Sequence, residues 1–185
     1  MARSARTRGF TLTELMITLA IAGVLAMIGA PAMGSLLART RAASAEAAIA
    51  GTLRHARSAA VMRNARVLVC PSRDGRRCNA GDDWQHGWII AQDSDHDGQP
   101  DGGAALILAQ ATMPAGTRVI TSIGRGQIAF QPSGSAGGSN VRFTICHANA
   151  REGKEVIVAN SGRVRLASAD AAHLQACLAG LQWSK

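Results

Sequence analysis

The fold is decided by the stretch RGFTLTELMITLAIAGVLAMIGAP, residues 8–31. Its apolar part runs from Phe10 to Ala30, which is 21 residues with a single charge, Glu14. A helix of about 20 apolar residues crosses the roughly 30 Å hydrocarbon layer of a bilayer. The sequence therefore predicts a membrane-spanning helix at residues 10–30.

The nine residues before this run carry three arginines and no acid. Such a positive segment should stay in the cytoplasm, which leaves the chain after Pro31 on the other side of the membrane. A secretory signal has its small-residue cleavage site after the apolar run, but here the small residue, Gly9, precedes it. Cleavage after Gly9 would make Phe10 the first residue of the mature chain and Glu14 the fifth.

This arrangement of Gly9, Phe10, Glu14 and Pro31 resembles a type IV prepilin. The resemblance implies that residues 1–9 are a leader, that a prepilin peptidase cleaves after Gly9 and N-methylates Phe10, and that the helix becomes a filament core. It also implies that Glu14 pairs with the N-terminal amine of a neighbouring subunit, because an unpaired carboxylate in hydrocarbon is costly. An ordinary signal anchor is the alternative.

Small apolar residues extend the helical pattern beyond Pro31. They recur at steps of three and four, which is the spacing of one helical face; they are Ala38, Ala42, Ala45, Ile49, Leu53, Ala56 and Ala60. Charged residues such as Arg54 and Arg57 lie off this stripe. We predict one helix over residues 10–62 whose second half packs its small residues on a domain.

Short runs with strand character follow, separated by Gly, Pro, Asp and Ser clusters. The candidate strands are Arg66 to Cys70, Gly87 to Gln92, Ala104 to Gln110, Arg118 to Ile123, Gln127 to Gln131, Val141 to His147, Glu155 to Ala159 and Arg163 to Ala167. No helical pattern separates them, which favours antiparallel sheets. The predicted class is α+β and type IV pilin-like, with the long helix packed on an antiparallel β-sandwich or open barrel at residues 63–185.

Two stretches of this β-rich part, VLVCPS at residues 67–72 and DWQHGWII at residues 83–90, resemble the FimT/GspH branch of minor pilins and pseudopilins. Gly162-Arg163-Val164-Arg165 adds to the resemblance. It implies a bacterial inner-membrane protein with one membrane pass and a periplasmic C-terminal domain. The protein would join a pilus or pseudopilus, with other pilins as its partners.

Four cysteines in an exported domain indicate two disulfides, because that compartment is oxidising. Cys70 and Cys78 flank a polar turn that a bridge would close. Cys146 ends a strand and Cys177 lies in the C-terminal segment, so a second bridge would tie the tail to the sheet. Metal binding by Cys70, Cys78, His86 or His147 is the alternative from residue type, but the spacings match no zinc pattern.

The segment Asp93 to Asp101 is rich in acids. Asp93, Asp95, Asp97 and Asp101 occupy positions one, three, five and nine of an EF-hand-type calcium loop, with glycine at position six. Position twelve is Ala104, so the bidentate glutamate is absent. An acidic turn between strands is therefore the favoured interpretation, with calcium as the alternative.

Arg163 and Arg165 should share one face of the last strand, because successive side chains alternate. They would stand about 6.6 Å apart, close to two nucleotide steps of about 3.4 Å along one strand. Such a pair can clamp a nucleic-acid backbone without reading bases, or it can be only the solvated face of a sheet. The resemblance favours the clamp, because Gly-Arg-x-Arg near the C-terminus marks FimT-type pilins that bind DNA during natural transformation.

DNA affinity should come from a local patch of basic side chains rather than from the whole surface. The reason is that the formal charge of +8 includes the three arginines of the leader, so the mature chain is only modestly positive. Second-rank contacts would be Arg118, Arg125, Arg142, Arg151 and Lys154. The chain has no Tyr, three Phe and three Trp, so base stacking should not dominate.

We therefore predict a minor pilin that binds DNA independently of sequence and supports DNA uptake and pilus assembly. The alternative is a GspH-like minor pseudopilin of a type II secretion system, a structural subunit without DNA binding. The five histidines are scattered and no catalytic motif is present. We expect no enzyme activity, no cofactor and no small-molecule substrate.

Overall fold

The computed structural model describes residues 11–82, 84–102, 106–122, 124–138, 140–148 and 152–180. The chain forms two compact units, Met1–Leu37 and Ala38–Lys185. One helix, α1 (Leu12–Arg63), contributes residues to both units. It was predicted at residues 10–62, and it continues through Pro31.

In the first unit, α1 begins with a capping box. The backbone N–H of Glu14 donates to Thr11 Oγ1 at 3.3 Å, and the N–H of Thr11 donates to Glu14 Oε2 at 3.1 Å. Each residue thereby satisfies a backbone donor that the first helical turn leaves open. The large apolar side chains described between Leu12 and Leu37 are exposed in the single chain.

Among the described residues, no helix has both the length and the apolar character needed to cross a membrane. Phe10, the first residue of the predicted span, lies outside the described residues, as does the whole leader. The membrane span at residues 10–30 stays a prediction.

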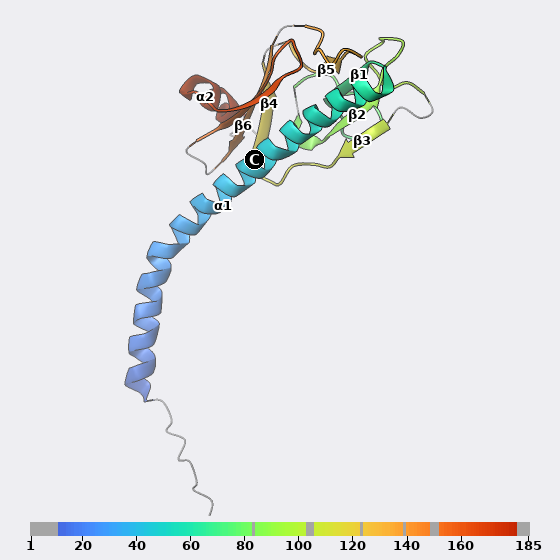
Figure 1. Ribbon diagram of the computed structural model, residues 1–185. Helices are drawn as coiled ribbons and strands as arrows, with labels where there is room; N and C mark the ends of the chain where they lie inside the picture. The colour runs from blue at the N-terminus through green and yellow to red at the C-terminus, as the bar shows by residue number, and fades with distance from the viewer. Residues whose placement is uncertain are drawn as a thin grey trace, which may run out of the picture. The chain divides into compact units, whose positions relative to one another are not determined.

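The second unit contains two antiparallel sheets (Figure 1). The first has the order β3-β2-β1-β5 and is built from β1 (Val67–Pro71), β2 (Trp88–Gln92), β3 (Leu106–Gln110) and β5 (Ile128–Phe130). The second has the order β4-β6-β7-β8 and is built from β4 (Thr117–Thr121), β6 (Val141–His147), β7 (Lys154–Val158) and β8 (Val164–Ser168). All eight predicted strands are present, each within two residues of its predicted bounds.

The core lies where the second half of α1 meets both sheets. Ile49 and Leu53 of α1 are buried in one cluster with Val69 of β1 and Phe143 of β6. The indole N–H of Trp88 donates to the Thr52 hydroxyl at 3.0 Å, which ties β2 to the helix. The alanine stripe is buried as predicted, because small residues let the helix backbone approach the sheets closely.

All eight strands, both disulfides and the described buried apolar side chains belong to the second unit. This unit therefore has a complete core of its own. A fragment that starts at Gly34 keeps that core and leaves out the exposed apolar half of α1.

Two short helices were not predicted: η1 (Trp84–His86) and α2 (Ala171–Ala179). The carboxylate of Asp170 caps α2 by accepting from the N–H of His173 at 2.8 Å. With nine residues, α2 is too short to show a clear helical period. The signal that could have revealed it is an aspartate directly before two alanines, which is a typical helix start.

Candidate nucleic-acid interface

The candidate interface is built on the turn between β7 and β8. Gly162 has a positive φ of +77° and is buried in this turn. Its N–H donates to the carbonyl of Ala159 at 2.8 Å, and the N–H of Ala159 donates to the carbonyl of Arg163 at 2.9 Å. A Cβ at position 162 would overlap the carbonyl oxygen of Gly134. Only glycine fits here, since both the backbone conformation and the space exclude a side chain.

The helix α1 also contacts Gly134, the residue that Gly162 packs against. Arg57 Nε donates to the carbonyl oxygen of Gly134 at 3.0 Å. The residues around Gly134 are therefore in contact with both α1 and the β7–β8 turn. The hydrogen bond between Arg57 and Gly134 joins residues that are 77 positions apart in the sequence.

Arg163 lies at a groove between α1 and the turn. The groove has a volume of about 510 Å³, and it is lined by Arg54, Arg57, Ser58, Val61, Gly162, Arg163 and Val164. All three arginines are exposed. Within the described parts of the chain, no carboxylate pairs with them. The groove is therefore strongly positive.

Arg165 lines a different groove from Arg163. It pairs with Ile157 in the sheet register and lines a cavity of about 510 Å³ together with Arg142 and His173. The strand begins at Val164, one residue later than predicted, so Arg163 belongs to the turn. Val164 packs against the core, whereas Leu166 is 51% exposed.

Arg142, a predicted second-rank contact, is held by a buried carboxylate. Its Nε lies 3.3 Å from Oε2 of Glu155, which is 4% exposed. Nδ1 of His173 lies 2.9 Å from the other oxygen, Oε1, and 2.9 Å from Oδ2 of Asp170. Glu155 thus offsets the charge of Arg142 within the protein.

The other second-rank residues are dispersed. Arg118 lies on β4, at the opposite edge of the sheet from β8. Lys154 pairs with Ser168, at the opposite end of the β7–β8 hairpin from Gly162. Arg125 reaches Gly138, where an added Cβ would lie 3.2 Å from its Nη1. Arg151 lies outside the described residues.

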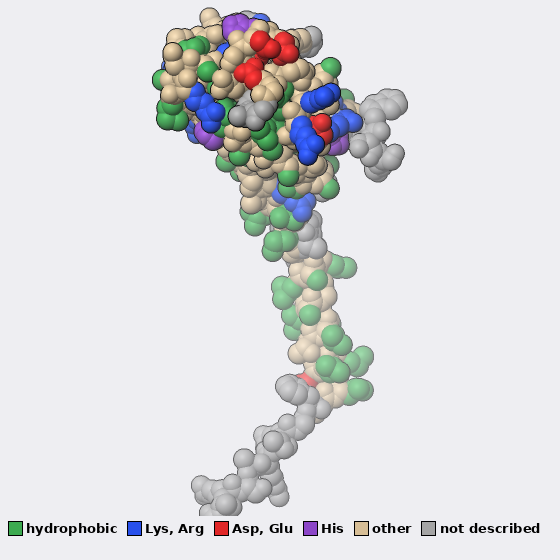
Figure 2. Space-filling model, turned by 90° about the vertical axis from the view of Figure 1, so that its right-hand side faces the viewer, with side chains coloured by type: hydrophobic (Ala, Val, Ile, Leu, Met, Phe, Trp, Pro, Cys, Tyr) green, Lys and Arg blue, Asp and Glu red, His purple; other side chains and the backbone are tan. Residues whose placement is uncertain are grey.

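Figure 2 shows one face of the molecule, on which Lys and Arg side chains lie in separate groups with uncharged surface between them. Whether any of these groups binds DNA stays a prediction. Sequence reasoning missed Arg54 and Arg57 as members of such a patch, because nothing local to α1 indicates which strand or turn lies beside it.

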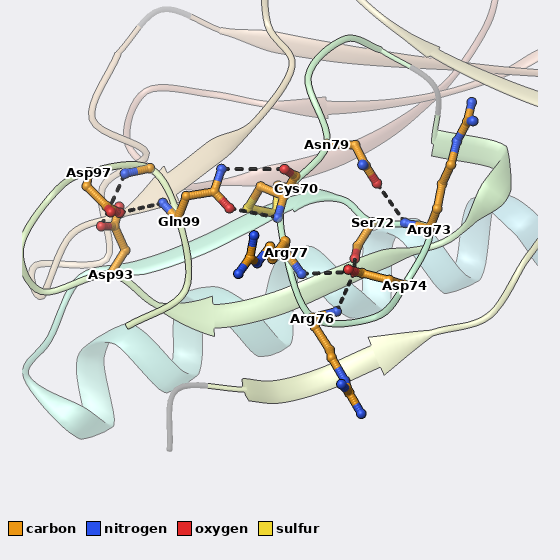
Figure 3. The surroundings of a disulfide bond; sticks show 12 residues. Cys70, Ser72, Arg73, Asp74, Arg76, Arg77, Asn79, Asp93, Asp97 and Gln99 are labelled. Carbon is orange, nitrogen blue, oxygen red and sulfur yellow. Dashed lines mark hydrogen bonds between the residues drawn. A yellow bond between two sulfur atoms is a disulfide. The ribbon is translucent and has the colours of Figure 1, made fainter. Parts of the chain in front are cut away.

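Both predicted disulfides are present, Cys70–Cys78 and Cys146–Cys177. The first disulfide closes the loop of residues 70–78. Within this loop the carboxylate of Asp74 accepts hydrogen bonds from backbone N–H groups (Figure 3). Asp74 Oδ1 accepts from the N–H groups of Arg76 at 2.8 Å and Arg77 at 3.0 Å. These bonds lower the pKa of Asp74. The side chains of Arg73, Arg76 and Arg77 are exposed and point in different directions. Arg76 and Arg77 nevertheless line one cavity, together with Gln99 and Asp101.

The acidic segment has the hydrogen bonds of a turn. Carboxylate oxygens of Asp93, Asp95 and Asp101 lie within 4.8 Å of one another, whereas Asp97 is not in this group. Asp93 is fully buried and lies 3.5 Å from Arg66 Nε. Asp101 accepts from the N–H of Ser94 at 2.9 Å, and Asp97 accepts from the N–H of Gln99 at 2.7 Å. Ala104, at loop position twelve, lies outside the described residues.

A long N-terminal helix that packs its second half on antiparallel sheets, with an apolar first half, defines a type IV pilin-like protein. The family model for type II transport protein GspH matches residues 36–162, and the prokaryotic N-terminal methylation motif matches residues 4–30. The first match covers more than half of the chain, which therefore belongs to the GspH family. Minor pilins and pseudopilins share this architecture.

Solved structures of two such proteins resemble the chain. The type IV minor pilin FimU of Pseudomonas aeruginosa is 21% identical, with a TM-score of 0.57 over 70% of this chain and 90% of that chain. The minor pseudopilin EpsH from the type 2 secretion system of Vibrio cholerae is 17% identical, with a TM-score of 0.50 over 69% of this chain and 97% of that one. At these identities the likeness shows the fold alone. No curated protein matches the chain.

Proposed function

We propose that this protein is a minor pilin whose C-terminal domain binds the backbone of DNA, independently of sequence, through Arg163 and Arg165. The observation that carries the proposal is the pair of exposed arginines beside a turn that only glycine can form. A flexible solvated loop has no need for a buried glycine packed against another backbone segment, as Gly162 is packed against Gly134. This packing gives Arg163 a defined position, and Arg165 follows two residues later on β8.

Phosphate is the ligand that suits these side chains. Arginine binds phosphate with two parallel N–H donors and keeps its charge at any physiological pH. With few cations at each site, binding should be weak, about micromolar or weaker, and should fall steeply as salt rises, because phosphate contacts release counterions. In a filament, this activity would support DNA uptake during natural transformation.

The proposed life cycle follows from the N-terminus. A prepilin peptidase would cleave after Gly9 and methylate Phe10, both of which lie outside the described residues. The protein would first reside in the inner membrane with its second unit in the periplasm, and would then join a pilus. Glu14 would pair with the N-terminal amine of its neighbour there. Its role is structural and ligand-binding rather than enzymatic.

A pseudopilin of a type II secretion system is the second candidate, and the match to the GspH model favours it. In that role the domain would contact other pseudopilins and would have no nucleic-acid ligand.

The discriminating experiment is a DNA titration of the fragment that starts at Gly34, at two salt concentrations. The Arg163→Ala, Arg165→Ala double variant should lose most of the affinity and about two units of the salt slope. If the double variant keeps both, the arginines are ordinary surface residues and the pseudopilin role is preferred. Equal binding of polyglutamate and DNA to the wild type would indicate general cation attraction.

A further inference from the structure

We infer that the groove between α1 and the β7–β8 turn is a phosphodiester-binding site, in which Arg54 and Arg57 of α1 act together with Arg163. Arg165 belongs to a separate subsite on the face of the second sheet. This inference rests on the proposed DNA binding. It assigns the principal contact with the DNA backbone to the groove beside α1.

The first support is that three arginines from two distant segments line the same groove. Arg54 and Arg57 are three residues apart on α1, so their Cβ atoms lie about 5–6 Å apart on one side of the helix. Arg163 reaches the same groove from the turn. Three guanidinium groups around one groove repel one another unless an anion lies between them.

The second support is the arrangement of donors. Arg57 uses Nε to bond the carbonyl of Gly134, which fixes its position. No group among the described residues bonds its terminal nitrogens, which can therefore face a ligand. Ser58 adds a hydroxyl to the lining, and Val61 and Val164 add an apolar surface. A sugar–phosphate backbone presents a charged group next to an apolar ring face, and the groove offers complementary groups for both.

The third support is that nothing in the described protein neutralises the groove. Arg142, on the neighbouring sheet face, has its charge offset by buried Glu155. Arg54 and Arg163 have no such carboxylate within the described ranges. Of the two grooves that the Gly-Arg-x-Arg segment touches, the one beside α1 therefore has the larger uncompensated positive charge.

The test compares two glutamine variants of the fragment that starts at Gly34. Arg54→Gln should weaken DNA binding about tenfold and lower the salt slope by about one unit. Arg39→Gln is the matched control, since it removes the same charge from an exposed position of the same helix, about 22 Å from Arg54 along the axis. Equal effects of the two variants would overturn the inference, provided that both unfold at the wild-type temperature.

A double-variant comparison tests whether the arginines share a ligand group. Arg54→Gln and Arg163→Gln should be non-additive, because they contact the same phosphate, whereas Arg54→Gln and Arg165→Gln should be additive. Additivity of both pairs would contradict a shared site at Arg163.

A third arm separates this inference from the proposed function. Inorganic pyrophosphate is titrated into the fragment while the arginine Nε–H signals are followed by NMR. Shifts at Arg54, Arg57 and Arg163 that saturate, with Arg39 unchanged, support the groove even if the protein fails to bind DNA. Equal shifts at Arg39 would reject the groove even if Arg165 still binds DNA.

Discussion

At the scale of single residues, Gly162 carries the strongest steric requirement of the interface. Gly162→Ala should destabilise the domain more than Gly124→Ala, which has a similar φ of +78° but open space around it. The control should cost about 1–2 kcal/mol for the left-handed conformation alone. Gly162→Ala adds an overlap with the backbone of Gly134, so the turn must shift.

Urea unfolding measures both glycine variants. We expect DNA affinity to fall in Gly162→Ala although no cation is removed, because Arg163 moves with the turn. Equal destabilisation by the two substitutions would show that the contact with Gly134 is easily relaxed.

His147 should make stability depend on pH. Burial, together with the nearby positive charge of Arg41, lowers the pKa of His147 below its ordinary value of 6.5. The unfolded chain therefore takes up a proton at a higher pH than the folded one, so this contribution to stability is complete above about pH 6.5 and declines as pH falls towards the lowered pKa. His147→Gln should remove that decline.

The measurement for His147 is the free energy of unfolding of both proteins at pH 7.5 and pH 5. Other titrating groups contribute equally to both curves, so the difference between the curves isolates His147. Parallel curves would mean that the folded protein accommodates the charged imidazole without cost.

At the scale of elements, the two disulfides differ in the length of chain that they close. Cys146–Cys177 spans 31 residues and Cys70–Cys78 spans 8. The chain-entropy relation gives about 4 kcal/mol for the longer loop and about 2.5 kcal/mol for the shorter one. Replacing each pair by serine should lower stability in that order.

Hydrogen exchange adds a structural readout to the serine variants. Loss of Cys146–Cys177 should free the amides of α2, because that bridge ties α2 to β6. Loss of Cys70–Cys78 should leave α2 protected. Protection of α2 in both variants would show that its packing alone holds it on the sheet.

At the scale of the whole molecule, the match of residues 4–30 to the N-terminal methylation motif leads to a prediction about processing and assembly. Coexpression with a prepilin peptidase should remove nine residues and add a methyl group to Phe10, which mass spectrometry detects. Glu14→Ala should still be cleaved but should enter filaments poorly, because it loses the carboxylate that we propose pairs with the neighbour. An intact N-terminus would contradict the prepilin assignment.

Thr11→Val separates the two possible roles of Glu14. The Thr11 hydroxyl takes part in the capping box, so this variant loses part of the cap while keeping the carboxylate. It should assemble nearly as well as the wild type if Glu14 acts between subunits. Equal defects in Thr11→Val and Glu14→Ala would indicate that capping of α1 is the important contact.

The sequence by itself determined the elements of this protein. The alanine stripe of α1, the eight strands and both cysteine pairings could be predicted because each depends on a local pattern or on a short list of partners. The helix α2 could not be predicted from a helical period, because its nine residues are too few to show one and the cap at Asp170 is its single local signal.

Only the tertiary structure decided which arginines lie around one groove. A strand period places Arg163 and Arg165 on one face, but β8 starts one residue later and the turn directs Arg163 to the groove beside α1. Arg54 and Arg57 join it across about a hundred residues of sequence, and Glu155 offsets the charge of Arg142. These relations depend on packing between distant segments, and no local pattern of residues encodes that packing.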